Sequence, residues 1–208
     1  MSAKNAYGII ALAGLAATLA PAANNKLESM SIVVDAGIVS FVSDTNVPAI
    51  SVKGKSTALH AQANVRRTAE GLQIEGIRAT VPVKSLATGM GLRDEHMRKY
   101  IFTTPDGQTP DVRFEAENAA CPAGHDVTCR LNGSLTIRGA TRPFSMPLKI
   151  RDDGALFKAA GDATVKLSDY GIERPTQLGV TTVDEVHLHF EFTARQPAGD
   201  TASAGGFR

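Results

Sequence analysis

The segment from Leu131 to Ile150, LNGSLTIRGATRPFSMPLKI, constrains the fold of the chain more than any other stretch. Apolar residues occupy alternate positions on both sides of a central break, with mostly polar residues between them. A period of two predicts β-strands that have one buried face and one wet face. Residues 138–143 predict the reversal between the strands, with Gly139 at a positive φ and Pro143 fixing the return. The segment is therefore predicted to be a β-hairpin, and it contains nothing that looks catalytic.

Alternation of the same kind recurs along the chain and predicts an all-β fold. Residues 32–42 predict two short strands or one bent strand, and further strands are expected within 50–66, 72–86, 112–120, 127–137, 144–150, 155–167 and 183–194. Pro143 and Pro147 interrupt backbone donation on the second strand of the hairpin, which favours a rim or an irregular edge there. These are about eight or nine strands at hairpin spacing without βαβ alternation, so the sheet is expected to be antiparallel. Such a chain closes as a barrel or stacks as a sandwich, and the interior of an eight-stranded barrel is filled by side chains or holds one elongated apolar ligand.

One short helix is expected, running from about Leu92 to Ile101. Apolar residues recur there at steps of three and four, which is the helical period. Asp94 lies early in the segment and Arg98 lies late, an arrangement that complements the helix dipole.

The two ends of the chain predict export and a tail. Lys4 is followed by an uncharged apolar run and then by small residues, with cleavage expected after Ala22 or Ala23. The run is about 12 residues, shorter than the roughly 20 that span a bilayer, so residues 1–23 are predicted to be a signal peptide and the protein to be periplasmic or secreted. Residues 24–195 then form the barrel domain, and residues 196–208, rich in Gly, Ala and Ser, are predicted to be a disordered tail.

The charge balance limits the classes of partner. Without its first 23 residues the chain carries 21 basic and 21 acidic residues, and it contains no tryptophan. A neutral protein has no long-range field that would recruit nucleic acid or an anionic membrane. No nucleic-acid partner is therefore expected, and any partner should be neutral or held by short-range contacts. The oligomeric state is left open by the sequence, and a dimer is one option.

The two cysteines, Cys121 and Cys129, flank a loop. In an oxidising compartment they are expected to form a disulfide that pins the hairpin made by residues 112–120 and 127–137. The alternative is a redox or metal pair assisted by His125.

Three further stretches are similar to one known family. The segment from Leu135 to Pro143 (LTIRGATRP) resembles the strand–turn–strand signature of the YceI-like domain family, and the segment from Val81 to Tyr100 resembles its strand and "TG…RD.HLR" helix. Ser168 to Ile172 resembles its late "SDFG" turn, and the three motifs occur in the family's order. Near residue 35 the family often has a tryptophan and a His-Ser pair, where this chain has Asp-Ala-Gly-Ile.

The resemblance implies a lipocalin-like barrel that holds a polyisoprenoid, such as an isoprenoid quinone, in its interior as a carrier or storage protein. It also implies no catalysis and no cofactor, a link to stress in some members, and a membrane electron-transfer or lipid-donor protein as a partner. Arg93, Asp94 and His96 are candidates for contacts with a ligand headgroup, or else they fix the helix to the barrel rim. The candidates for lining the cavity are Val81, Val83, Phe114, Leu135, Ile137, Met146, Leu148, Phe190 and Phe192.

Two alternatives to lipid binding remain open at this point. His187 and His189 share one face of a strand and could ligate zinc in a hydrolase, given a third ligand such as His60. Neither HExxH nor GxSxG occurs in the chain to support that reading. The other alternative is an interaction module whose barrel is packed solid, whereas lipid binding requires a hollow wide enough for a prenyl chain.

Overall fold

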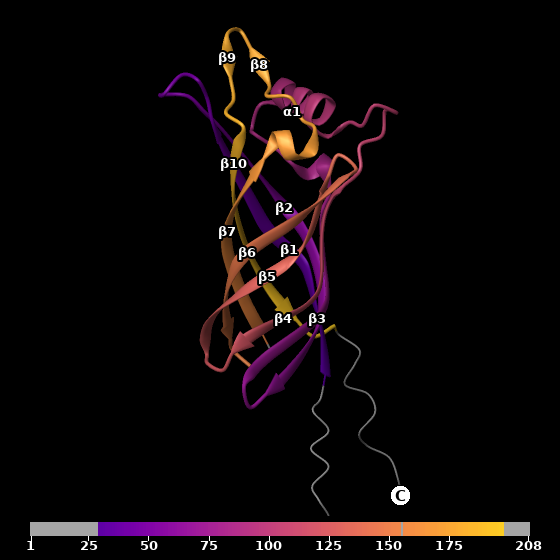
Figure 1. Cartoon of the computed structure of the whole chain (residues 1–208), viewed down its shortest axis with the longest axis vertical. Coiled ribbons are helices and arrows are strands. Elements are labelled where there is room, and N and C mark those ends of the chain that lie inside the picture. Colours follow the sequence, from indigo (N-terminus) through magenta and orange to yellow (C-terminus); the bar gives the residue numbers. More distant parts are fainter. Residues whose placement is uncertain (1–28, 155, 198–208) are drawn as a thin grey trace, which may run out of the picture.

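A closed antiparallel barrel of eight strands forms the body of the protein (Figure 1). The computed structural model describes residues 29–154 and 156–197, so the predicted signal peptide and most of the predicted tail lie outside the described residues. Around the barrel the strands follow the order β1-β10-β7-β6-β5-β4-β3-β2. The barrel strands are β1 (Ser29–Asp44), β2 (Ser51–Thr68), β3 (Gly71–Val81), β4 (Val112–Pro122), β5 (Asp126–Ile137), β6 (Ala140–Asp152), β7 (Leu156–Lys166) and β10 (Glu185–Arg195). The predicted eight-stranded antiparallel barrel is confirmed.

The remaining elements gather at one end of the barrel. They are η1 (Val83–Ser85), α1 (Gly91–Met97), the π-helical turn η2 (Arg98–Phe102), η3 (Leu167–Tyr170), β8 (Thr176–Gln177) and β9 (Val180–Thr181). Figure 1 shows α1, the β8–β9 hairpin and the β1–β2 loop at this end, and we call it the helix end. The first and last described residues lie at the opposite end, which we call the terminus end. Within the described ranges, no helix is both long enough and apolar enough to cross a membrane.

The structure changes or resolves three of the predictions made for individual strands and turns. The strand expected over residues 72–86 ends at Val81, because residues 83–85 turn into η1 and the Val83 amide donates to the Asp111 carboxylate at 3.1 Å. Residues 29–44 form one bent strand, whose register shifts on both sides of Gly37. The hairpin reverses over Arg138 and Gly139 alone, at φ values of 52° and 76°, which match the two-residue turn that twisted strands prefer.

The β5–β6 hairpin is joined more firmly within itself than to the rest of the barrel. Its two strands share 12 paired positions, whereas β5 pairs with β4 at three positions and β6 pairs with β7 at four. Pro143 and Pro147 lie in the part of β6 beyond its last pair with β7, and proline has no amide hydrogen to donate. The hairpin is therefore the section of wall that can move while breaking the fewest ladder hydrogen bonds.

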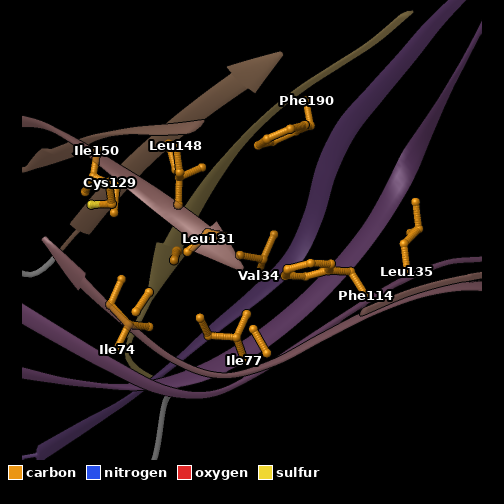
Figure 2. Packing of buried hydrophobic residues seen from close by; sticks show 14 of the residues in the cluster. Val34, Ile74, Ile77, Phe114, Cys129, Leu131, Leu135, Leu148, Ile150 and Phe190 are labelled. Carbon is orange, nitrogen blue, oxygen red and sulfur yellow. The ribbon is translucent and has the colours of Figure 1, made fainter. Parts of the chain in front are cut away.

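Inward-facing apolar side chains from all eight strands meet along the barrel axis. Figure 2 shows residues such as Val34, Ile77 and Leu131 converging from different strands. Several phenylalanines fold over glycines directly opposite them on the neighbouring strand, namely Phe41 over Gly54 and Phe190 over Gly161. A Cβ on Gly161 would come within 2.4 Å of the Phe190 ring, so only glycine leaves space for that ring against the wall.

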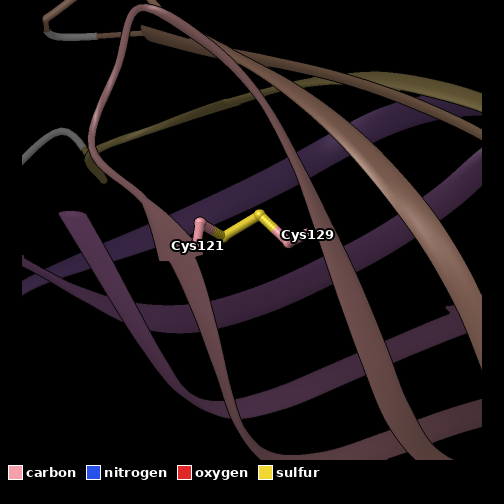
Figure 3. Close-up of a disulfide and its surroundings, with 2 residues drawn as sticks. All are labelled: Cys121 and Cys129. Atoms are coloured by element: carbon pink, nitrogen blue, oxygen red, sulfur yellow. A yellow bond between two sulfur atoms is a disulfide. The ribbon is translucent and has the colours of Figure 1, made fainter. Parts of the chain in front are cut away.

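The disulfide closes the β4–β5 seam where the backbone ladder is missing. Cys121 and Cys129 are bonded, with their Cα atoms 4.8 Å apart, near the terminus end of the two strands (Figure 3). Both are buried in the main core, so the bond is part of the barrel interior. The predicted disulfide is confirmed, and the alternative of a metal pair with His125 is set aside, because both sulfur atoms are in the bond and no group of three metal-ligating side chains occurs among the described residues.

Replacing both cysteines with alanine should lower the free energy of unfolding by about 2–3 kcal/mol, the loop-closure value for so short a loop. Urea denaturation of the Cys121→Ala/Cys129→Ala variant measures this loss. The oxidised wild-type protein is the reference, and the reduced wild type should unfold at nearly the same urea concentration as the variant. Equal midpoints for the oxidised wild type and the variant would contradict the role assigned to the bond.

Substituting Gly161 with alanine should destabilise the barrel by about 1–3 kcal/mol, because the new methyl group overlaps the Phe190 ring and the Pro147 carbonyl. Gly91→Ala is the matched control, since a Cβ there meets nothing within 4 Å. Thermal unfolding of both variants checks the expectation, and equal melting temperatures would show that the glycine–phenylalanine contact does not constrain the wall.

Candidate ligand-binding interior and mouth

The barrel encloses a small apolar cavity in the half nearer the terminus end. Its volume is about 70 Å³, and apart from Gln62 its lining residues are apolar. Small side chains from β2 and β7, namely Ala61, Ala63 and Ala159, contribute to the wall beside larger residues such as Val34. The arrangement can hold hydrocarbon but offers almost no hydrogen-bonding group, so any polar part of a ligand has to lie elsewhere.

The nine candidate lining residues lie at different depths. Leu148 and Phe192 line the cavity itself. Phe114, Leu135 and Phe190 are buried in the main core cluster, and Ile137 and Met146 pack against it while half-buried. Val81 belongs to a second cluster beneath the helix, with Leu59, Leu86 and Met97. Val83 is buried within η1 and is not part of a barrel strand.

Sequence reasoning missed most of the residues that surround the cavity. Ala61 and Ala63 stand in an alternating segment, which predicted a strand but did not say which face was turned inward. Their small size is the signal that could have identified them, since a large side chain at either position would fill the space. Ala79 is half-buried and packs against both apolar clusters.

Toward the helix end the interior is less tightly closed. Several residues on the inner face there are only half-buried, including Val39, Phe41, Val186 and Leu188. Their registers place them on the same face as Phe190, which is buried. The interior therefore presents accessible apolar surface close to the mouth at the helix end.

A larger hollow lies outside the barrel. An open groove of about 650 Å³ crosses β1, β10, β7, β6 and β5, and its exposed side chains include Lys149, Lys158 and Glu191. Three consecutive residues from each strand line it, and the exposed side chains among them place it on the outer wall. We therefore place the candidate ligand site inside the barrel.

Polar groups of the helix attach it to the preceding loop. The buried Asp94 carboxylate accepts hydrogen bonds from the Thr88 amide at 2.7 Å and from the Thr88 hydroxyl at 2.5 Å. Arg93 donates to the Thr88 hydroxyl and carbonyl oxygens, each at 2.8 Å, and Arg98 donates to the Leu86 carbonyl. These bonds hold the loop and α1 as one unit over the apolar cluster of Val81, Leu59, Leu86 and Met97.

The hydrogen bonds from Thr88 lower the pKa of Asp94, and the nearby charges of Arg98 and Arg93 act in the same direction. His96, the third headgroup candidate, is half-buried and packs edge-on against Tyr100, with 5.6 Å between ring centroids. Of the three candidates, His96 is thus the one whose side chain takes no part in the hydrogen bonds to Thr88.

A second unit, η3 and the turn after it, covers the opposite side of the mouth. Leu167, Tyr170 and Ile172 are buried in the main core, and burial raises the pKa of Tyr170. The Ser168 amide and hydroxyl donate to the Asp184 carboxylate at 2.9 and 2.6 Å. The Ser-Asp-Tyr-Gly motif therefore serves to close this side of the barrel.

Two arginines of the β5–β6 hairpin join both units at the mouth. Arg142 donates to the Asp169 carbonyl at 2.7 Å, and Arg138 donates to the Thr103 carbonyl at 2.8 Å. The three sequence motifs that define the family resemblance thus converge on one structural feature, the mouth at the helix end.

The two strand histidines lie on the outer face of β10. His189 contacts the Asp162 carboxylate at 2.8 Å, and His187 contacts the Thr164 hydroxyl at 3.2 Å. Across residues 29–154 and 156–197, no three His, Cys, Asp or Glu side chains are grouped so that they could hold a metal ion. The hydrolase alternative therefore has no third ligand in the described part of the chain.

The depressed pKa of Asp94 predicts a stability term that depends on pH. Because the folded-state pKa lies below the unfolded-state value of about 4, the term is present at neutral pH and disappears as pH falls through the folded-state value. We expect Asp94→Asn to lower the free energy of unfolding by about 1 kcal/mol at pH 7 and to match the wild type at low pH. Glu95→Gln, an exposed position on the same helix, is the control. Urea unfolding between pH 7 and pH 3 tests this, and a constant difference across that range would contradict it.

Comparison with known proteins supports the likeness seen in the geometry. A family model of the YceI-like domain matches residues 30–194. A UPF0312 protein of Pseudomonas paraeruginosa is 32% identical over 104 residues, covering 47% of this chain and 52% of that protein. The chain thus matches about half the length of this curated relative.

Solved structures resemble the barrel as a fold. Burkholderia cenocepacia BcnA superposes with a TM-score of 0.59 at 22% identity, covering 76% of this chain and 95% of that one. A polyisoprenoid binding domain from Saccharophagus degradans, implicated in plant cell wall breakdown, superposes with a TM-score of 0.59 at 16% identity, covering 81% and 99%.

Proposed function

The chain belongs to the YceI-like domain family, and from that premise we propose that it binds a polyisoprenoid lipid, such as an isoprenoid quinone, inside its barrel without catalysing a reaction. The observation that carries the proposal is a closed barrel whose inner face is apolar on every strand and whose cavity is lined by hydrocarbon. Each methylene group that leaves water contributes roughly 0.8 kcal/mol, so a long prenyl tail gains more from such an interior than a compact polar molecule would. The polyisoprenoid binding domain of Saccharophagus degradans, which has the same fold, supports the choice of ligand class.

The proposal requires the interior to widen when the tail enters. The cavity of about 70 Å³ is well below the roughly 300–1,000 Å³ of small-molecule sites, and it is narrower than the expected prenyl-wide hollow. The short ladders that flank the β5–β6 hairpin favour outward movement of this part of the wall. Met146, on the inner face of β6, has a flexible side chain that can adapt to a tail. We infer that the tail enters from the helix end, where the inner face is half-buried.

The headgroup is proposed to remain at the mouth. The cavity is lined by apolar side chains, and Gln62, which lies between the inward-facing Ala61 and Ala63, turns its side chain outward. A quinone ring or other polar group is therefore better accommodated where His96 and the edges of the two mouth units lie. Arg93 and Asp94 would support this region through the loop they hold in place, while His96 offers a ring nitrogen for a ligand oxygen.

We also propose that the protein is exported and acts as a carrier or storage protein in the periplasm or outside the cell. The predicted signal peptide supports export, and so does the disulfide, since such bonds persist in oxidising compartments. A membrane electron-transfer or lipid-donor protein would then supply or receive the ligand. Fractionation of the native host, with detection of the protein by antibody, tests the location.

Filling the cavity should abolish uptake of the ligand. Ala61→Phe places a ring in the space that the tail is proposed to occupy, so we expect at least a tenfold loss in binding of a prenyl quinone, measured by native mass spectrometry. Ala120→Phe is the matched control, because Ala120 is exposed on the outer face of β4. Equal loading of the two variants, both folded by circular dichroism, would contradict an interior site.

Organic extraction of protein purified from its own host identifies the natural ligand. Recovery of a prenyl lipid from the wild type, but not from Ala61→Phe, supports the proposal. Repeated recovery of empty wild-type protein that also fails to take up prenyl quinones would instead favour the interaction module, a function with which the small cavity is also compatible.

A further inference from the structure

Exposed apolar side chains of the described residues are concentrated at the helix end of the barrel. Five large ones lie there on three segments of the chain, and we call them the apolar rim: Ile50, Met90, Leu92, Tyr100 and Leu178. Their exposed fractions run from 43% for Ile50 to 97% for Leu178. The sixth exposed large apolar residue, Leu156, lies at the terminus end, where β7 begins. Exposed apolar side chains that cluster at one end of a protein are typical of a surface that binds a membrane or another protein.

Leu178 is the most pronounced member of the apolar rim. It occupies the tip of the β8–β9 hairpin with a φ of 51°, a conformation that a branched side chain rarely adopts. The adjacent Gly179 also has a positive φ, and the hairpin stands away from the barrel body (Figure 1). The two-residue turn accounts for the positive φ, as it does at Arg138 and Gly139, but it does not require an apolar side chain, and Leu178 buries almost none of its surface against the chain.

The segments that carry four of the five rim residues are basic, whereas residues 171–185 around Leu178 contain three acidic residues and one arginine. Residues 50–55 and 83–102 contain six Lys or Arg residues and two acidic residues, of which Asp94 is buried and hydrogen-bonded. The two segments are adjacent, because Lys55 and Ala87 exchange backbone hydrogen bonds of 2.9 Å. Lys99 also lies over the Tyr100 ring at 5.2 Å, an aromatic–lysine pair of the kind that suits the headgroup layer of a bilayer.

We propose that the helix end docks onto a lipid bilayer that contains anionic lipids, with the apolar rim inserted among the headgroups. Insertion by short apolar tips and attraction of the basic segments to anionic headgroups strengthen each other. The rim surrounds the mouth through which the apolar interior is reached, so a docked barrel takes up or releases its ligand without exposing the tail to water. The role of docking in ligand uptake and release depends on the proposed function. The docking surface itself is inferred independently, from the exposed apolar rim and the basic segments beside it.

Vesicle sedimentation tests the proposal with the full chain. The wild type should sediment with phosphatidylcholine vesicles that contain phosphatidylglycerol, and at least tenfold less with pure phosphatidylcholine vesicles. Leu92→Asp/Leu178→Asp should weaken binding to the anionic vesicles about tenfold or more. Leu156→Asp should bind as the wild type does, because it places an aspartate on an exposed leucine at the opposite end. Lys53→Glu/Lys55→Glu should also weaken binding, and added salt should reduce wild-type binding.

Docking is overturned if the wild type remains in solution with anionic vesicles, or if the rim variant sediments as the wild type does. Equal binding to vesicles with and without phosphatidylglycerol would contradict the proposed attraction between the basic segments and anionic headgroups. Uptake of a short-chain prenyl quinone from solution, measured on the same preparations, keeps this result separate from the proposed function. A rim variant that loses vesicle binding while retaining quinone uptake supports docking. A wild type that takes up quinone normally but does not bind vesicles refutes docking and leaves the proposed function unaffected.

Discussion

Closure of the sheet by backbone hydrogen bonds is the constraint on which the rest of the structure depends. Each of the eight barrel strands pairs with two neighbours, so the sheet can be apolar on its inner face without presenting an edge to other chains. The pairing is uneven, however, and the β5–β6 hairpin is linked to its neighbours by seven paired positions in all. The buried disulfide secures the end of the β4–β5 seam that the ladder leaves open.

The two ends of the barrel differ in the side chains that cover the interior. At the terminus end, Arg67 forms a bidentate pair with Asp152, at 2.8 and 2.9 Å, and covers the Phe157 ring. Phe157 lines the apolar cavity, so these contacts lie next to the cavity at the terminus end. At the helix end, two units held by hydrogen bonds flank a mouth whose inner wall is half-buried and whose outer tips are apolar. This difference supports the proposal that the ligand enters and leaves at the helix end, which is also the end proposed to meet the membrane.

The family motifs have a structural explanation that does not require each residue to touch a ligand. Asp94 and Arg93 hold the loop before α1, Ser168 holds η3 to Asp184, and Arg138 joins the hairpin turn to the end of η2. The proposed widening of the barrel for a tail would require a mouth whose parts keep their positions relative to each other. The motifs supply that rigidity, whereas the residues lining the cavity are ordinary apolar ones that carry no distinctive pattern.

The sequence by itself determined the strands, the short helix, the antiparallel class and the disulfide, because alternation, helical period and cysteine spacing are local properties. It also indicated the family through motifs that act within short stretches. Only the tertiary structure decided which face of each strand points inward, how far each ladder extends and how small the cavity is. Those features depend on contacts between residues distant in the chain, such as Phe190 over Gly161 or Ala61 facing the cavity across from Leu148. The apolar rim became visible for the same reason, since Ile50, Leu92 and Leu178 share one end only after the barrel has closed.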